Sequence, residues 1–318
     1  MAYPVLGLHH VTATVDDAQG DLDFCLGALG LRLVKKTVNF DNHSVYHFYY
    51  GTERGAPGTI WTTFPYRGWD VPVGAKGAGQ VTVTALSVPE GALDLWQARL
   101  DELGVPAAKQ PARFGRGVLA VEDPSGLGFE LVESPDDARS PWAGGALGAD
   151  MAVRGLHSVT LTVRSAAETV AFMENVLGYR VEAQDGHRSR LGVNGGGAGR
   201  AVDVLEAPHA QAARNGLGTV HHVAMAIEDP DDQVRLREEL LAMGRQVTEI
   251  RDRQYFQSIY FREPGGVLFE VATMAPGFTA DEPLEDLGRA LKLPPWEEPH
   301  RATIEATLPA VSYGVSHA

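Results

Sequence analysis

The sequence contains a single cysteine, Cys25, among 318 residues. One thiol excludes an intramolecular disulfide and any cysteine-rich zinc site. No apolar run approaches the roughly 20 residues that a membrane-spanning helix needs, so we expect no membrane partner. The first residues lack the basic and apolar regions of a secretory signal peptide. These absences favour a cytoplasmic protein.

Positive charge is also scarce. The 27 lysines and arginines are outnumbered by 41 aspartates and glutamates, which gives a formal net charge of −14. Nucleic acids and anionic membranes are polyanions and would not attract such a chain. We therefore expect no nucleic-acid partner. The hydrophobic fraction of 44% is nevertheless that of a globular protein with sizeable cores.

What the sequence does contain is an internal repeat. Residues 7–15 read Gly-Leu-His-His-Val-Thr-Ala-Thr-Val, and residues 155–163 read Gly-Leu-His-Ser-Val-Thr-Leu-Thr-Val. Residues 122–130 match residues 262–270 in the same way, around a Pro-x-Gly turn. Each copy combines strand-like alternation with a helical period that ends at a glycine.

The repeat divides the chain into four units, each a strand, a helix and several further strands. They cover about residues 5–66, 78–134, 153–207 and 218–273. We expect an N-terminal half over 1–134, a linker rich in Gly, Ala, Asp and Pro over 135–150, a C-terminal half over 151–273 and a tail over 274–318. The tail pattern predicts a short helix around 284–291 that packs over the body.

Histidines occupy corresponding positions in two of the four units. Alternation places His10 and Thr12 on one face of the first strand, with His9 on the apolar face that should pack on helices. The fourth unit repeats the pair as His221-His222, whereas the third has Ser158 in place of His10. The second unit has Thr82 or Val83 there. We therefore expect His10 and His222 to line the interior.

One carboxylate stands out in the same way. Glu270 lies within the apolar run 267–272, where burial is costly unless the group is paired or bound to a cation. Its counterpart Glu130 has a similar setting, but its own unit offers no histidine. We expect Glu130 to be structural and paired with a base of its own sheet.

His10, His222 and Glu270 therefore form the candidate ligand set. Two imidazoles and one carboxylate match the facial triad of non-haem iron, which leaves positions open for substrate and O₂. All three belong to units one and four, so these two units should pair with each other, and units two and three likewise. Histidines in loop-like, exposed or tail contexts, His47 among them, receive no role.

Four such units in one chain resemble the vicinal oxygen chelate superfamily, which includes glyoxalases, extradiol dioxygenases and antibiotic-binding resistance proteins. The resemblance extends over the chain up to the tail. It implies an α+β fold in which four βαβββ modules form two open β-barrels, one of them around a metal or ligand. The superfamily hosts several chemistries, so the fold does not fix the function.

Longer motifs resemble one group within it, the ring-cleaving dioxygenases that open hydroquinones. They are Gly-Leu-His-His-Val-Thr at 7–12, Val-Asn-Phe-Asp at 38–41, Tyr-Tyr-Gly at 49–51, the stretch 251–270 and Leu-Lys-Leu-Pro-Pro-Trp at 291–296. Asn-His-Ser at 42–44 departs from the Asp/Asn-Pro-Ser of many members. The resemblance implies the same three metal ligands, with pocket residues at His9, Thr12, His221, Arg253 and Tyr260.

The resemblance also implies roles for the pocket residues. Tyr260 would hydrogen-bond a bound substrate oxygen, and Arg253 would stabilise developing negative charge. His9 or His221 would transfer protons near neutral pH, although alternation turns neighbouring side chains to opposite faces. A surface ion pair of Arg253 with Asp252 or Glu249 is the structural alternative.

We therefore expect a dioxygenase that uses Fe(II), or alternatively Mn(II), to insert O₂ into a substituted hydroquinone or related diphenol. Its partners would be a small aromatic substrate and O₂. A glyoxalase-type lyase or isomerase is one alternative, but it normally takes a carboxylate from each contributing unit, and the strand at 59–64 has none. A non-catalytic, resistance-type binding protein is the other, and should lack metal ligands. The ring substituents and a homo-oligomeric state are left open.

Overall fold

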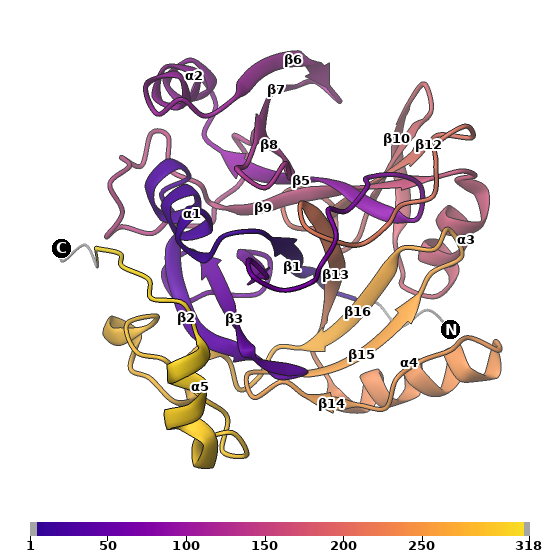
Figure 1. The fold of residues 1–318 in the computed structure, drawn as a ribbon. Helices are drawn as coiled ribbons and strands as arrows, with labels where there is room; N and C mark the ends of the chain where they lie inside the picture. The colour runs from indigo at the N-terminus through magenta and orange to yellow at the C-terminus, as the bar shows by residue number, and fades with distance from the viewer. Residues whose placement is uncertain (1–4, 315–318) are drawn as a thin grey trace.

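The computed structural model describes residues 5–314, which form two eight-stranded sheets. Residues 1–4 and 315–318, which belong to the predicted N-terminal half and tail, lie outside the described residues. Each sheet is curled into an open half-barrel, and the helices are few (Figure 1). The fold is α+β, as the sequence predicts. Within the described residues, no helix combines the length and the apolar character needed to cross a membrane.

The first sheet is built from the two ends of the chain. Its strands are β1 (Gly7–Val15), β2 (Arg32–Asn39), β3 (Asn42–Gly51), β4 (Ile60–Pro65), β13 (Thr219–Ile227), β14 (Arg251–Asp252), β15 (Gln257–Arg262) and β16 (Leu268–Thr273). Their spatial order is β14-β15-β16-β13-β1-β4-β3-β2.

The second sheet is built from the middle of the chain. Its strands are β5 (Gln80–Val88), β6 (Ala107–Arg113), β7 (Arg116–Glu122), β8 (Gly128–Glu133), β9 (Gly155–Val163), β10 (Arg180–Asp185), β11 (Arg188–Gly192) and β12 (Ala201–Glu206). Their spatial order is β10-β11-β12-β9-β5-β8-β7-β6.

Each repeat unit has one helix after its first strand, and the tail has its own short elements. The unit helices are α1 (Ala18–Leu22), which continues as a π-helical segment η1 (Asp23–Ala28), α2 (Leu93–Glu102), α3 (Ala167–Asn175) and α4 (Pro230–Ala242). The tail elements are η2 (Phe278–Ala280), η3 (Leu284–Asp286), η4 (Glu298–His300) and α5 (Arg301–Thr307).

An antiparallel pair at the centre of each sheet joins units that are not consecutive. In the first sheet β1 pairs with β13, so that Thr12 lies opposite His222. In the second sheet β5 pairs with β9. The first and fourth units therefore share one sheet, and side chains 212 residues apart in the sequence become neighbours.

Aromatic side chains tie the two sheets together. Phe24 of η1 packs on Phe129 of β8 with ring centres 5.6 Å apart, and Trp61 of β4 packs on the same ring at 4.7 Å. Phe172 of α3 packs on Phe261 of β15 at 5.9 Å. All belong to one continuous apolar core, whose burial is the main source of stability.

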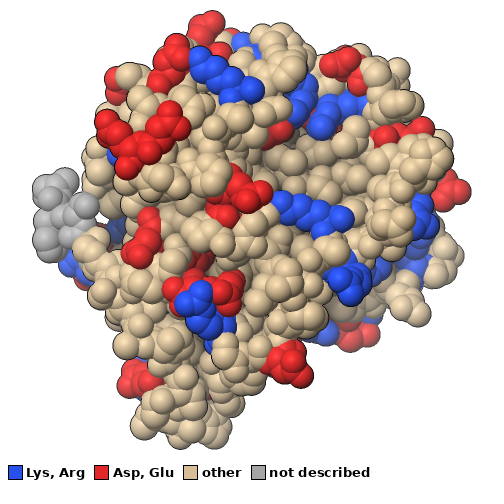
Figure 2. All heavy atoms as spheres, turned by 45° about the horizontal axis from the view of Figure 1, so that its top comes forward, with Lys and Arg blue, Asp and Glu red and all other residues tan. Residues whose placement is uncertain are grey.

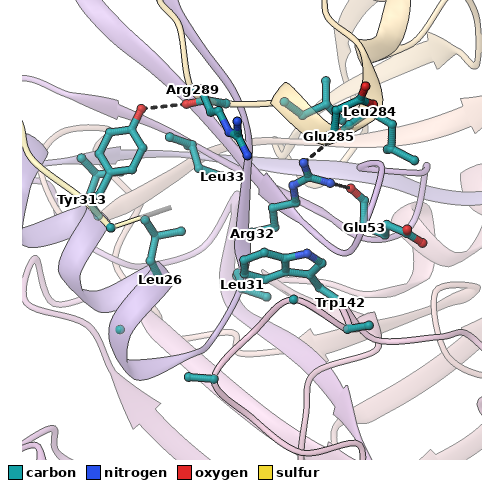
Figure 3. A pocket seen from close by; sticks show the side chains of 18 of the residues that line it. Leu26, Leu31, Arg32, Leu33, Glu53, Trp142, Leu284, Glu285, Arg289 and Tyr313 are labelled. Atoms are coloured by element: carbon teal, nitrogen blue, oxygen red, sulfur yellow. Dashed lines mark hydrogen bonds between the residues drawn. The ribbon is translucent and has the colours of Figure 1, made fainter. Parts of the chain in front are cut away.

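Residues of the predicted linker and of the tail meet beside β2. Arg32 donates hydrogen bonds to the backbone oxygens of Glu53 and Leu284, and its guanidinium lies 5.9 Å from the ring of Trp142, beside a cavity of about 780 Å³ (Figure 3). The helix predicted at 284–291 is wrong in extent. Only the short turn η3 forms there, because Gly288 adopts φ 80° and turns the chain away, and the tail helix lies further on, at α5.

A buried lysine fixes the tail to β2. The Lys35 side chain is fully buried, and its Nζ atom lies 2.6 Å from Asp281 and 2.5 Å from Glu282. The ammonium lies 5.0 Å from the ring centre of Tyr255, whose hydroxyl donates to Asp281 at 3.1 Å. A charge at this depth is tolerated only with such partners.

We predict that Lys35→Ala lowers the free energy of unfolding by about 3–5 kcal/mol, because two carboxylates lose their buried cation. Lys109→Ala is the matched control, since Lys109 pairs with Asp94 at the surface and such pairs contribute about 0–1 kcal/mol. Urea denaturation followed by circular dichroism measures both. Similar losses for the two variants would contradict the role given to Lys35.

Candidate metal centre

A β-bulge in each of the two central strands shapes the site. The pairing of β1 with β13 shifts register around His9 in β1 and around His221 in β13. A bulge redirects the side chains beside it. The expectation that His9 points away from His10 is therefore wrong. The Nδ1 atoms of His9 and His10 lie 2.8 Å apart, as do those of His221 and His222.

Three predicted ligand residues meet beside these bulges. The His10 Nε2 atom lies 3.3 Å from His222 Nε2 and 3.2 Å from Glu270 Oε2, and His222 Nε2 lies 2.8 Å from the same oxygen. All three side chains are buried. The register explains the meeting, because Ala224 of β13 lies opposite both His10 of β1 and Glu270 of β16.

The chemistry of these donors fits a bound cation. Each ligand imidazole meets a second imidazole through Nδ1, and an Nδ1–H donated there leaves the Nε2 lone pair directed at the cluster. Glu270 Oε1 accepts a hydrogen bond from Ser258, whereas Oε2 is buried with no hydrogen-bond partner among the described residues. Three lone-pair atoms thus converge, an arrangement that a divalent metal ion satisfies.

The electrostatic surroundings keep the carboxylate ionised and the outer imidazoles neutral. Burial alone would raise the pKa of Glu270, but the adjacent imidazoles, His10 first, lower it well below the ordinary value. Burial, followed by the neighbouring ligand histidine, lowers the pKa of both His9 and His221 to about 3. Neutral His9 and His221 can accept the Nδ1–H of the ligand histidines.

The three residues line a cavity of about 430 Å³. This volume is in the range of small-molecule sites. Aromatic side chains make up much of the wall: Phe40, Tyr49, Phe64, Tyr66, Phe256 and Tyr260. Of the five predicted pocket residues, Thr12, His221, Arg253 and Tyr260 also line it. His9 lies behind His10, with its ring against Phe256 at 4.9 Å.

Arg253 and Tyr260 form one unit in this wall. Arg253 Nε donates to the Tyr260 hydroxyl oxygen at 3.0 Å, and a terminal nitrogen of Arg253 lies 3.2 Å from Asp41. The predicted alternative partners have other contacts, since Glu249 pairs with Arg237 and Asp252 accepts from the backbone N–H of Gln254.

The charge states of this pair follow from its setting. Burial acts to lower the pKa of Arg253, but Tyr260 and Asp41 raise it above the ordinary value, so the guanidinium stays charged. Burial raises the pKa of Tyr260, so the phenol keeps its proton. Because the Tyr260 oxygen accepts from Arg253, its hydrogen remains available to donate into the cavity.

His47, to which we assigned no role from the sequence, belongs to the same wall. It lies in strand β3 rather than in a loop, it is only partly exposed, and its ring packs against those of Tyr49 and Phe64. The signal that could have placed it is the alternating run at 45–50, which puts His47 and Tyr49 on one face.

The corresponding place in the second sheet holds ion pairs instead. Glu130 lies opposite Ala85 as Glu270 lies opposite Ala224. Arg113 donates to both oxygens of Glu130, at 2.5 Å and 2.8 Å. The prediction that Glu130 is paired by a base of its own sheet is confirmed. Ser158, which replaces His10, contacts His157 Nδ1 at 2.9 Å.

The outer surface carries charges of both signs. Figure 2 shows Asp and Glu interspersed with Lys and Arg over the face that it presents, with basic side chains beside a hollow. Among the described residues of that face there is no broad basic surface of the kind that binds a nucleic-acid backbone.

Two curled sheets made of four βαβββ units, with an interior His–His–Glu cluster in one of them, define a protein of the glyoxalase-like fold class. The family model described as the Glyoxalase/Bleomycin resistance protein/Dioxygenase superfamily matches residues 7–131 and 155–271. The chain belongs to this superfamily.

Relatives within the superfamily match nearly the whole chain. The chain is 42% identical over 97% of both chains to MhqO of Bacillus subtilis (strain 168), described as a ring-cleaving dioxygenase. It is 40% identical over 92% of both chains to a chlorohydroquinone/hydroquinone 1,2-dioxygenase of Sphingobium indicum. A crystal structure described as a dioxygenase from B. subtilis superposes with a TM-score of 0.93 at 41% identity, covering 98% of this chain and 99% of the other.

We predict that His222→Ala and Glu270→Gln each weaken Mn(II) binding by more than about 100-fold, which exceeds the 10- to 100-fold typical of losing an outer-shell partner. Glu130→Gln should bind Mn(II) as the unmodified protein does, because Glu130 already has Arg113. Isothermal titration with Mn(II) measures all three. Unchanged binding in Glu270→Gln, or lost binding in Glu130→Gln, would place the metal elsewhere.

Proposed function

We propose that this protein is a metal-dependent ring-cleaving dioxygenase that inserts O₂ into a substituted hydroquinone or related diphenol. Fe(II) is the metal we propose, with Mn(II) as the alternative, held by His10, His222 and Glu270. The observation that carries the proposal is the meeting of these three buried side chains in an aromatic-walled cavity. The names of the relatives support the same reaction class.

The proposed reaction is balanced without a further reductant. Both atoms of O₂ enter the product, and one carbon–carbon bond of the ring breaks beside a hydroxyl-bearing carbon. A bound Fe(II) or Mn(II) ion supplies a Lewis acid and open positions at which the substrate and O₂ come together. The protein must then orient the ring, exclude competing water and manage one phenolic proton.

Tyr260 and Arg253 are placed to handle the charge that develops on the substrate. The Tyr260 hydroxyl donates into the cavity, and the positive charge of Arg253 behind it strengthens that hydrogen bond. Thr12 adds a hydroxyl to the same wall. These contacts favour a phenolate over a phenol and so promote attack on O₂.

The first role that we assign to His9 and His221 is to orient the side chains of His10 and His222. Each contacts the Nδ1 atom of its neighbouring ligand at 2.8 Å, which fixes the ring plane and the tautomer of His10 and His222. His221 also lines the cavity, and because its Nδ1 atom accepts from His222, its Nε2–H is available to donate a hydrogen bond to the substrate. With its pKa lowered to about 3, His221 is a poor proton acceptor near neutral pH, contrary to the expectation from the sequence.

The setting in the cell is part of the proposal. A site made of imidazoles and a carboxylate needs no thiolate, and the lone Cys25 is buried away from it. We propose that the enzyme acts in the cytoplasm on a small aromatic substrate. Its oligomeric state is left open.

We predict that the Fe(II)-reconstituted protein, mixed anaerobically with methylhydroquinone or catechol, consumes one O₂ per substrate when oxygen is admitted and forms a ring-opened product. An oxygen electrode and mass spectrometry with ¹⁸O₂ measure this, and both labelled atoms should appear in the product. Turnover of a hemithioacetal without O₂ uptake on any diphenol would establish the isomerase alternative instead. Tight diphenol binding without turnover would favour a binding protein.

We predict that Tyr260→Phe lowers kcat by about 100-fold, the effect of removing one hydrogen bond to developing charge, while Mn(II) binding is retained. Tyr66→Phe is the control in the same cavity, since its hydroxyl accepts from Asn39 at 3.0 Å. Its kcat should stay within a few-fold of the unmodified protein. Equal kcat values for the two variants would remove Tyr260 from the mechanism.

A further inference from the structure

A short chain of hydrogen bonds crosses the cavity wall from β3 to β1. The His47 Nε2 atom lies 2.9 Å from the Thr62 hydroxyl oxygen, and Thr62 donates to the Thr12 hydroxyl oxygen at 2.9 Å. Along β1 and β4, His10 pairs with Ile60 and Thr12 pairs with Thr62. Thr62 therefore lies one inward-facing position beyond the metal cluster. His47 extends the chain of hydrogen bonds further from that cluster.

The direction of this chain fixes the tautomer of His47. Thr62 has one hydroxyl hydrogen, which it donates to Thr12, so its oxygen can only accept from His47. His47 must then carry its proton on Nε2. The Nδ1 atom is left as an acceptor, and it has no hydrogen-bond partner among the described residues.

The surroundings hold that ring still and uncharged. The His47 ring centre lies 4.0 Å from that of Tyr49 and 4.3 Å from that of Phe64, both rings are tilted against it, and these contacts restrict its rotation. Burial first, and then His10, His222 and Arg253, lower the pKa of His47 well below its ordinary value. A fixed, neutral imidazole with a free lone pair is suited to accept a hydrogen bond from a ligand in the cavity.

We propose that His47 is a specificity-determining residue, which accepts a hydrogen bond from the substrate hydroxyl that lies away from His10, His222 and Glu270. This inference rests on the proposed function and names the substrate class of the same site. The other end of the hydrogen-bond chain complements His47, because Thr12 accepts from Thr62 and keeps its own hydrogen to donate near the metal cluster. The wall therefore offers a donor at one end and an acceptor at the other.

This arrangement of a donor and an acceptor favours binding of a para-diphenol over binding of other phenols. A hydroquinone has one oxygen on each of two opposite edges of the ring, so one can lie at the metal cluster while the other donates to His47. A catechol has both oxygens on one edge and leaves the His47 acceptor without a donor. A phenol has no second hydroxyl. An unpaired acceptor in a cavity costs binding free energy, and this cost provides the discrimination.

Two variants of His47 distinguish its proposed hydrogen bond to the substrate from its contact with Thr62. In His47→Gln the amide nitrogen can replace Nε2 as the donor to Thr62, but no atom replaces Nδ1. In His47→Asn the amide oxygen can replace Nδ1, but the side chain does not reach Thr62. The ligands are hydroquinone and phenol, which differ only in the distal hydroxyl. Isothermal titration of the Fe(II)-reconstituted proteins under argon gives each dissociation constant without turnover.

The unmodified protein should bind hydroquinone at least about tenfold more tightly than it binds phenol. His47→Gln should weaken hydroquinone binding about tenfold and leave phenol binding within twofold. His47→Asn should retain part of the preference. Retained phenol binding also reports an intact cavity, so a misfolded variant is recognised. An unchanged ratio of the two constants in His47→Gln, whether both ligands weaken equally or neither weakens, would overturn the proposal.

The proposed function is judged by a different result. If the unmodified protein takes up O₂ with a diphenol while His47→Gln keeps the full preference for hydroquinone, only the role of His47 fails. If the unmodified protein takes up no O₂ with any diphenol, the dioxygenase assignment fails first. The ratio of kcat/KM for methylhydroquinone to that for catechol should also fall about tenfold in His47→Gln.

Discussion

The antiparallel pairing of β1 with β13 is the contact on which the rest of the site depends. This pairing places Thr12 opposite His222 and brings the His10 side chain next to that of His222, although the two histidines are 212 residues apart in the sequence. The bulges at His9 and His221 then add a second imidazole behind each ligand. Backbone hydrogen bonds at the centre of a sheet are among the most rigid elements of a fold. Side chains held in this way are pre-organised to bind a metal ion.

The two sheets show how one architecture supports either a reactive site or a structural one. Both place a buried glutamate at the same register position, and a buried carboxylate must be paired or bound to a cation. In the second sheet Arg113 meets that need with two hydrogen bonds. In the first sheet Glu270 meets two imidazoles and keeps one oxygen without a hydrogen-bond partner. The choice of partner decides whether a cation site remains.

The repeat made the meeting of His10, His222 and Glu270 predictable, because a comparison of four related units separates what the fold needs from what one unit has added. Glu130 could be set aside for the same reason. The bulges could not be predicted, since each lies at the third residue of its strand, with too few residues before it for a shift in the alternation to show. They bring the His9 ring against that of His10. His47 was missed because its role comes from Thr62 and Phe64 on another strand. The turn at Gly288 likewise depends on packing against β2.

The central claim is that the two ends of the chain build a single metal centre. Anomalous X-ray diffraction from crystals of the protein grown with Mn(II) tests it most directly. We predict one strong anomalous peak per chain in the first sheet, within coordination distance of the His10 and His222 Nε2 atoms and a Glu270 carboxylate oxygen. A peak coordinated by other residues, or by the second sheet beside Glu130, would contradict the account.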